Sequence, residues 1–201
     1  MTIWFATGNI HKKQELQAIL SGHGIKIPAD RGIDFDPDET GTSFLENALL
    51  KARALYRLVQ EPVIADDSGL CVDALDGRPG IYSARYSGPE GAGSTTGGKI
   101  LSAPERNALL LQELGDNPCR SARFVCAMAL LLNEDRFFIA QETLEGEIIP
   151  TARGDKGFGY DPLLYLPALG RTVAELSEET KNRLSHRGKA GRQIARMLAT
   201  V

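Results

Sequence analysis

The sequence contains no apolar run that approaches the ~20 residues of a membrane-spanning helix. Its start, Met1–Phe5, lacks the basic residues and the cleavage site of a secretory signal peptide. The three cysteines are odd in number and follow no metal-ligand spacing. These absences predict a cytoplasmic protein with no membrane partner, because free thiols persist in a reducing compartment.

Internal repeats and low-complexity linkers are also missing, as are a nucleophile elbow, an HExxH pair and paired CxxC motifs. Composition is ordinary for a globular protein, with 42% hydrophobic and 24% charged residues over 201 positions. This length, residues 1–201, suits one domain or two closely packed lobes. The net charge of −3 hides an asymmetry, because residues 181–201 hold six Lys or Arg and no acid. A basic segment of this kind can bind a polyphosphate, lie in solvent as a helix face or grip nucleic acid nonspecifically.

The chain is organised around an apolar run, 63–65, that leads directly into Asp66 and Asp67. The pattern predicts a short buried strand that ends at the two acids, followed by a Ser68-Gly69 turn and a second strand over 70–75. Buried carboxylates are costly unless something compensates for them, and in open α/β sheets a ligand or a metal at the carboxyl ends of the strands usually does so. At most one of the two acids can face the same way as Ile64, since strand side chains alternate. A plain Asp-Ser-Gly turn is the alternative reading.

A first strand is predicted over 3–6, and Thr7, Gly8 and Asn9 follow it. Asn9 is the expected N-cap of a helix over 12–20. The N-terminus of a helix after a glycine turn offers N–H groups to an anion. Lys12, a cation in the first turn, is easier to explain with a phosphate nearby.

Four acids, Asp34, Asp36, Asp38 and Glu39, lie ahead of a helix that we predict to start with a Ser43–Glu46 capping box and to end near residue 60. Such a cluster can complement the helix dipole or supply a second carboxylate to Mg²⁺, which takes one or two carboxylates plus substrate phosphates.

The middle of the chain predicts a mixed sheet. A glycine-rich loop over 87–98 is interpreted as a mobile lid, and Ser102 and Glu105 as the cap of a helix that stops at Gly115. Runs at 123–132 and 137–149, joined by 133–135, predict an antiparallel hairpin.

Two stretches near the C-terminus carry further signals. In residues 154–162, three glycines interleave with Phe158 and Tyr160 before an Asp161-Pro162 step, so that the loop can approach a flat ligand or bury its rings in the core. Thr172 and Glu175 indicate a short capped turn. Ser185 is the expected cap of the final helix, and it places His186 and Arg187 at a positive dipole end, where cationic or donor groups need an anion or a carbonyl as a partner.

Taken in order, six motifs resemble those of the inosine triphosphate pyrophosphatase family over nearly the whole chain. They are Thr7-Gly8-Asn9-x-x-Lys12, Thr42-x-x-x-Glu46-Asn47-Ala48, Ala65-Asp66-Asp67-Ser68-Gly69, Pro79-Gly80-x-Tyr82-Ser83-Ala84-Arg85, Gly157-Phe158-Gly159-Tyr160-Asp161-Pro162 and Ser185-His186-Arg187. The resemblance implies an α/β fold, an elongated mixed β-sheet flanked by helices, with two lobes and a central cleft. It also implies a Mg²⁺-dependent homodimer that hydrolyses XTP, ITP and dITP to the monophosphate and pyrophosphate.

The resemblance assigns roles to residues of this chain. Asp67 is the implied catalytic base and also contacts Mg²⁺, and the second metal ligand falls at Asp38, where Glu39 could substitute. The implied triphosphate contacts are Thr7, Gly8, Asn9, Ile10, His11 and Lys12, and Ser68 also touches the substrate. The implied base contacts are Phe158, Gly159, Tyr160, Asp161, Lys181, His186 and Arg187. Arg187 or backbone N–H groups would read the 6-oxo group of the base, because adenine would leave such a donor unpaired at a cost of about 1–3 kcal/mol.

Two other functions are weighed against this one. A phosphatase acting on another phosphorylated small molecule would release orthophosphate instead of pyrophosphate. A non-catalytic nucleotide- or RNA-binding module would bind through the basic C-terminus with salt sensitivity and without turnover. The module would leave the two adjacent aspartates without a role, so the sequence favours an enzyme with no nucleic-acid partner.

Overall fold

The computed structural model describes residues 1–88 and 101–200. Most of the predicted lid, 87–98, therefore lies outside the described residues. The chain divides into two compact units. Unit 1 comprises Met1–Ser68, Val125–Thr143 and Asn182–Val201, and unit 2 comprises Gly69–Phe124 and Leu144–Lys181. The description of 1–201 as one domain with two lobes stays a prediction.

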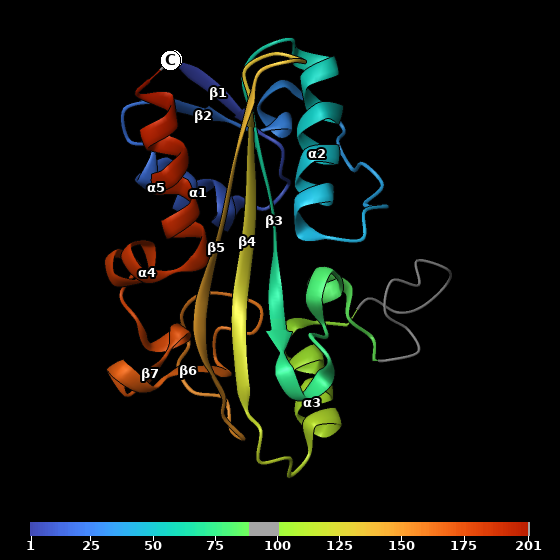
Figure 1. Ribbon diagram of the computed structural model, residues 1–201, viewed down its shortest axis with the longest axis vertical. Coiled ribbons are helices and arrows are strands. Elements are labelled where there is room, and N and C mark those ends of the chain that lie inside the picture. The colour runs from blue at the N-terminus through green and yellow to red at the C-terminus, as the bar shows by residue number, and fades with distance from the viewer. Residues whose placement is uncertain (89–100, 201) are drawn as a thin grey trace. The chain divides into compact units, whose positions relative to one another are not determined.

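The strands of the described residues form one mixed seven-stranded sheet in the order β2-β1-β3-β4-β5-β6-β7 (Figure 1). Their bounds are β1 Thr2–Phe5, β2 Gly24–Lys26, β3 Val63–Val72, β4 Ser121–Leu131, β5 Phe137–Ile148, β6 Leu164–Leu166 and β7 Arg171–Thr172. β1 pairs in parallel with β2 and β3, whereas β6 pairs antiparallel with β5 and β7. The mixed α/β sheet predicted from the sequence is therefore confirmed.

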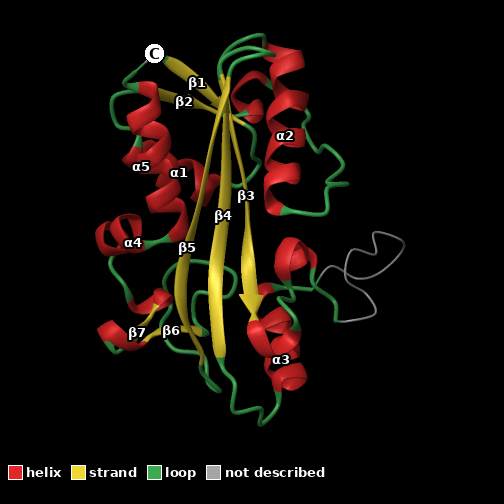
Figure 2. Ribbon diagram, viewed as in Figure 1, coloured by secondary structure: helices red, strands yellow, loops and turns green. Residues whose placement is uncertain are grey.

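Five α-helices accompany this sheet in the described residues (Figure 2). They are α1 Ile10–Ile19, α2 Phe44–Val59, α3 Ala103–Leu114, α4 Glu178–Leu184 and α5 His186–Leu198. Local capping chemistry explains where four of them begin. The side chains of Asn9, Ser43, Ser102 and Ser185 each accept a hydrogen bond from an amide of the following turn.

The predicted Ser43–Glu46 cap is present, since Ser43 Oγ accepts from the Glu46 amide, and the Glu46 carboxylate accepts from the amide and hydroxyl of Thr42 and also interacts with the Ser43 amide. One predicted local structure is wrong in detail. Residues 63–72 form one continuous strand, β3, with no turn at Ser68-Gly69, and residues 73–75 of the predicted second strand form a 3-10 turn instead. Asp66 and Asp67 consequently lie inside a strand, and the turn-forming residues after them adopt extended backbone because their neighbours in the sheet hold them there.

In unit 1, the two faces of the sheet carry separate hydrophobic cores, with α1 and α5 on one side and α2 on the other (Figure 1). The α1–α5 core contains Ile3, Phe5, Leu16, Ile64 and Ile194 among others. The α2 core contains Trp4, Ala52, Leu55, Val63 and Ala65 among others. Strand alternation places Ile64 in the first and its neighbours Val63 and Ala65 in the second.

Unit 2 has a third core, to which β3 contributes Leu70 and Val72, and α3 contributes Leu110 and Leu114. β4 and β5 are adjacent in the sheet, and the Leu132 amide donates to the Arg136 carbonyl in the connection between them. This connection is the predicted hairpin. The predicted capped turn at Thr172 is also present, since the Thr172 amide donates to the Glu175 carboxylate.

Candidate active site

Asp66 and Asp67 point to opposite faces of β3, and both are almost completely buried, with 1% and 6% of their surface exposed. Asp66 lies on the side of Ile64 and contacts residues of α1 and α5. Asp67 lies on the side of Ala65 and contacts residues of α2. Sequence alternation predicted that only one of them could share the side of Ile64, and the contacts show that it is Asp66.

Asp67 sits in a group of polar residues supplied by α2 and the loop before it. The Lys51 ammonium lies 3.2 Å from Asp67 Oδ1 and 2.7 Å from Glu39 Oε1. Asn47 donates to Asp67 Oδ2 at 3.2 Å and accepts from the Gly41 amide at 2.9 Å. Gly41 is needed at this point, since a Cβ there would lie 2.7 Å from Asn47 Oδ1. The loop is thus held against the helix and the strand by one amide side chain.

The electrostatics of this group differ from those of an ordinary surface aspartate. Burial raises the pKa of Asp67, and the neighbouring Lys51 opposes that rise only in part. Burial alone would lower the pKa of Lys51, but the carboxylates of Asp67, Asp66 and Glu39 raise it, so the lysine stays charged. A raised carboxylate pKa makes Asp67 a better proton acceptor than an exposed aspartate.

Asp38, the predicted second metal ligand, is exposed, whereas its neighbour Glu39 is half-buried and shares Lys51 with Asp67. The segment 33–39 alternates, so that Ile33, Phe35 and Glu39 turn inward while Asp34, Asp36 and Asp38 are exposed. Ile33 and Phe35 pack against the α2 core and set this register. Of the two acids left open by the sequence, Glu39 is the one that lies with Asp67.

Lys12, Arg187, Glu15 and Ser68 surround Asp66. Lys12 Nζ lies 3.0 Å from Asp66 Oδ1, and Arg187 donates to Asp66 Oδ2 from Nε at 3.1 Å and from Nη2 at 2.9 Å. Arg187 also donates to Glu15 at 2.7 Å and to Ser68 Oγ at 2.7 Å. The anionic partner that the sequence required for Arg187 is therefore the Asp66 and Glu15 carboxylates. Burial would raise the pKa of Asp66, but Lys12 and Arg187 hold it far below its usual range.

The predicted phosphate-contact segment, 7–12, begins α1 in unit 1. Asn9 caps the helix by accepting from the amides of His11 and Lys12, and Thr7 Oγ1 accepts from the Asn9 amide. Gly8, Ile10 and His11 are exposed. The segment thus has the strand–turn–helix geometry that the sequence predicted, with a lysine in its first turn.

The predicted base contacts divide between the units. In unit 2, Asp161 Oδ2 accepts from the Phe158 amide and from Lys181 Nζ, each at 2.9 Å, and Lys181 Nζ lies 4.5 Å from the centroid of the Phe158 ring. Gly157 allows this arrangement, because a Cβ there would lie 2.1 Å from Asp161 Oδ2. Gly159 is half-buried, and Tyr160 is buried with its hydroxyl donating to the Ser83 carbonyl. His186 and Arg187 are buried in unit 1.

Sequence reasoning missed Lys51, Asn47 and Glu15 as members of these groups. Asn47 stands in one of the quoted family motifs but was given no role, and the signal for Lys51 was its spacing of four residues from Asn47, which places both on one face of α2. Glu15 is three residues after Lys12, but its partner Arg187 is 172 positions away in the sequence. Pairings over such separations leave no local pattern.

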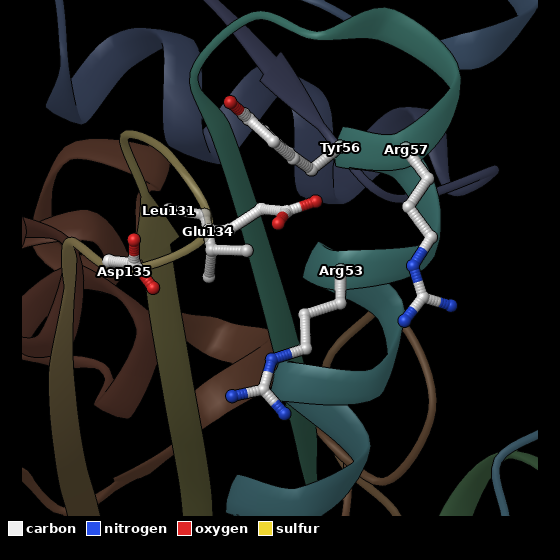
Figure 3. Close-up of a pocket in the computed structure, with 6 residues that line it drawn as sticks. All are labelled: Arg53, Tyr56, Arg57, Leu131, Glu134 and Asp135. Carbon is white, nitrogen blue, oxygen red and sulfur yellow. The ribbon is translucent and has the colours of Figure 1, made fainter.

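A separate cavity of about 310 Å³ lies in unit 1 between α2 and the β4–β5 connection (Figure 3). Its lining consists of Arg53, Tyr56, Arg57, Leu131, Glu134 and Asp135. Two arginines and two acids balance, so the lining favours neither an anion nor a cation. None of the predicted site residues lines it, and we assign no ligand to it.

Fold and site together define an α/β protein with a buried carboxylate–lysine centre on a strand of a mixed sheet. The model of the Ham1 family matches residues 3–197, and the chain belongs to that family. It is 50% identical over 198 residues, 98% of each chain, to a protein of Treponema denticola named dITP/XTP pyrophosphatase. The solved structures of a HAM1 protein from Coxiella burnetii and of the Staphylococcus aureus Ham1 protein are each 37% identical to it. Their TM-scores are 0.87 and 0.85, with all of this chain covered and 100% and 99% of theirs. The resemblance read from the sequence is thus confirmed at the level of the family.

Proposed function

We propose that this protein hydrolyses the non-standard purine nucleoside triphosphates XTP, ITP and dITP to the monophosphate and pyrophosphate, and so removes them from the nucleotide pool. The observation that carries the proposal is the buried Asp67 carboxylate, whose pKa burial raises, held between Asn47 and Lys51 with Glu39 beside it. The relatives named dITP/XTP pyrophosphatase support the choice of substrate class.

Asp67 acts as the base in this mechanism. Its carboxylate accepts a proton from a water molecule that attacks the α-phosphorus, and the bond to the bridging oxygen breaks so that pyrophosphate leaves. Asn47 fixes the orientation of the carboxylate through Oδ2, which leaves Oδ1 with Lys51. Lys51 lies beside both acids, where its charge also favours the negative phosphates of the substrate.

Glu39 and Asp67 are the residues that would hold the metal, which we propose to be Mg²⁺. No group of three His, Cys, Asp or Glu side chains suited to a metal exists among residues 1–88 and 101–200. Mg²⁺ requires only one or two carboxylates when substrate phosphates supply further ligands. The donor set fits, since two carboxylates already converge on one ammonium and together exceed its charge. When bound, the ion would neutralise charge that develops on the phosphates.

The remaining substrate contacts are proposed from the family motifs. Thr7, Gly8, Asn9, Ile10, His11 and Lys12 would contact the phosphates, because they form a helix N-terminus with a lysine. Ser68 would also contact the substrate. The Phe158 ring, with Gly159, Tyr160, Asp161 and Lys181, would hold the base, joined by His186 and Arg187. The base role of Arg187 stays a prediction, and any such contact must compete with the carboxylates that it already binds.

The alternative function of a nucleotide- or RNA-binding module rests on the basic C-terminal segment, residues 181–201, and several of its cations have partners within the chain. Lys189 donates to the Thr143 carbonyl, and Arg192 donates to the carbonyls of Asn182 and Arg183 at the end of α4. Arg187 is buried. The bonds to carbonyls orient Lys189 and Arg192 but leave their charge in place, whereas Arg187 is paired with the Asp66 and Glu15 carboxylates and is not available to a polyanion.

One assay tests the function. The protein is incubated with Mg²⁺ and with XTP, ITP, dITP, ATP or GTP, and pyrophosphate and orthophosphate are scored separately. We expect pyrophosphate from the first three nucleotides and little from the last two. Orthophosphate as the product would support the phosphatase, and salt-sensitive binding without product would support the binding module.

We further propose a cytoplasmic homodimer, as the family resemblance implies. The three cysteines are free, which suits a reducing compartment. None of the helices in the described residues is long and apolar enough to cross a membrane. Light scattering on the purified protein tests the dimer, for which a mass of twice 21.8 kDa is expected.

A further inference from the structure

Asp66 is the centre of a set of ion pairs on the α1–α5 side of β3. Its two oxygens accept from Lys12 and twice from Arg187, and the Cys126 thiol lies 3.9 Å from Oδ2. Arg187 also donates hydrogen bonds to the Glu15 carboxylate and to the Ser68 hydroxyl. Two cations and two carboxylates are present, so the set is neutral, in contrast to the group around Asp67.

Burial excludes Asp66 from direct contact with a substrate. Only 1% of its surface is exposed, and both its oxygens already have cationic partners. Solvent reaches two charged members of the set, Lys12 and Glu15, with 16% and 14% of their side chains exposed, and Lys12 is the cation of the two. An ammonium has three donors, and Asp66 takes one of them. The lysine can therefore keep this contact and still bind an anion.

The ion pairs of Asp66 also connect three elements of unit 1, which are α1, α5 and β3. Lys12 belongs to the segment that begins α1, Arg187 to the first turn of α5, and Ser68 is next to Asp67 in β3. The Asp66 carboxylate thus binds one cation from each helix. The guanidinium of Arg187 also donates to the Ser68 hydroxyl and fixes its position. Loss of that carboxylate would leave two cations side by side in a buried position, where they repel each other.

We propose that Asp66 is a positioning residue, whose carboxylate holds the Lys12 ammonium where it binds the triphosphate and holds Arg187 where it fixes Ser68. This role rests on the proposed function, since it presumes a triphosphate substrate. The two neighbouring aspartates then have different roles, because Asp67 acts on the water whereas Asp66 keeps the cations in place.

A double-mutant cycle between Asp66 and Lys12 tests the proposal. Asp66→Asn should raise the KM for ITP about tenfold or more, because small displacements of a binding group are costly. In the Lys12→Ala background the same change should raise the KM by less than about threefold, because the contact through which it acts is already gone. A purely structural role for Asp66 predicts the same factor in both backgrounds and would overturn the proposal.

The Lys13–Asp30 pair supplies the matched control, since Lys13 is the next residue of α1 and its partner is exposed. Asp30→Asn should leave the KM unchanged. If Asp66→Asn does not fold, Asp66→Glu replaces it in the cycle, because it keeps the buried charge while moving the carboxylate by one methylene. The fluorescence of Trp4, the only tryptophan and a buried one, reports folding for each variant.

The wild-type protein separates this inference from the function on which it rests. Absence of pyrophosphate from all three non-standard nucleotides in wild type would refute the proposed function. Turnover in wild type, together with equal KM factors in both backgrounds, would refute the role of Asp66 alone. Amine labelling of Lys12, read by mass spectrometry, needs no activity: it should be faster in Asp66→Asn than in wild type, and an equal rate counts against the positioning contact.

Discussion

Asp66 faces two cations on one side of β3, whereas Asp67 faces a single lysine that it shares with Glu39 on the other side. The first group is neutral, and the second carries one excess negative charge. The pKa of Asp66 is accordingly held far below its usual range by Lys12 and Arg187 against the effect of burial, while burial raises the pKa of Asp67. Two adjacent residues of one type thus acquire different chemistry from the elements packed on each face.

The difference shows how one strand can support two separate roles. A group whose named charges balance suits the positioning of its cations, because no ligand is required to balance it. A group with excess negative charge suits a metal ion and a reaction, because a cation is favourable there and a carboxylate with a raised pKa can accept a proton. The separate roles of the two aspartates can be tested by removing one acid at a time.

Removal of the Asp67 charge should have the largest effect. Asp67→Asn keeps the shape of the side chain but cannot accept the proton, so kcat for ITP should fall by about 10² or more. Steady-state kinetics at saturating Mg²⁺ measures this, with the thermal unfolding midpoint as the control for folding. A kcat close to that of wild type would remove Asp67 from the role of base.

The second prediction concerns the acid that accompanies Asp67. Glu39→Gln should raise the Mg²⁺ concentration for half-maximal activity by about tenfold or more, in the range known for groups that support metal binding. Asp38→Asn is the matched control and should change it little, since Asp38 is exposed. A large rise in that Mg²⁺ concentration in Asp38→Asn and little change in Glu39→Gln would instead identify Asp38 as the metal ligand, as the sequence predicted.

The third and smallest effect is expected at Asp73, which pairs with Arg123 in unit 2 at 45% exposure of its side chain. Asp73→Asn should lower the free energy of unfolding by less than about 1 kcal/mol, as for other exposed pairs. Asp66→Asn should lower it by about 3–5 kcal/mol, because a buried charge loses its partner. Urea denaturation measures the free energy of unfolding of both variants. An equal decrease in Asp73→Asn and Asp66→Asn would show that burial does not set the strength of these ion pairs.

Much of the fold could be predicted from the sequence because its signals are local. Asn9, Ser43, Ser102 and Ser185 each mark a helix start by a hydrogen bond within four residues. The hairpin, which spans 121–148 in the structure, was predicted from two apolar runs over 123–132 and 137–149 and a short polar connection. Family motifs added the site residues that no pattern of periodicity would have indicated.

The continuity of β3 could not be predicted in this way. Asp, Ser and Gly favour turns locally, and only the surrounding sheet and the distant cations Lys12 and Arg187 make an extended, buried course favourable. The same holds for the choice between Asp38 and Glu39, which depends on the register that Ile33 and Phe35 set against the α2 core. Both features arise from tertiary contacts and not from residue type.

The most direct test of the central comparison is a titration of the two carboxyl groups by carbon NMR in the metal-free protein. We expect the pKa of Asp67 to lie above the ordinary aspartate value of about 4. Its proton-accepting form is then lost at a higher pH than in an exposed aspartate. The Asp66 signal should remain that of the ionised form down to the lowest pH at which the protein stays folded. A low pKa at Asp67 together with an ordinary or raised pKa at Asp66 would contradict the separate roles of the two aspartates.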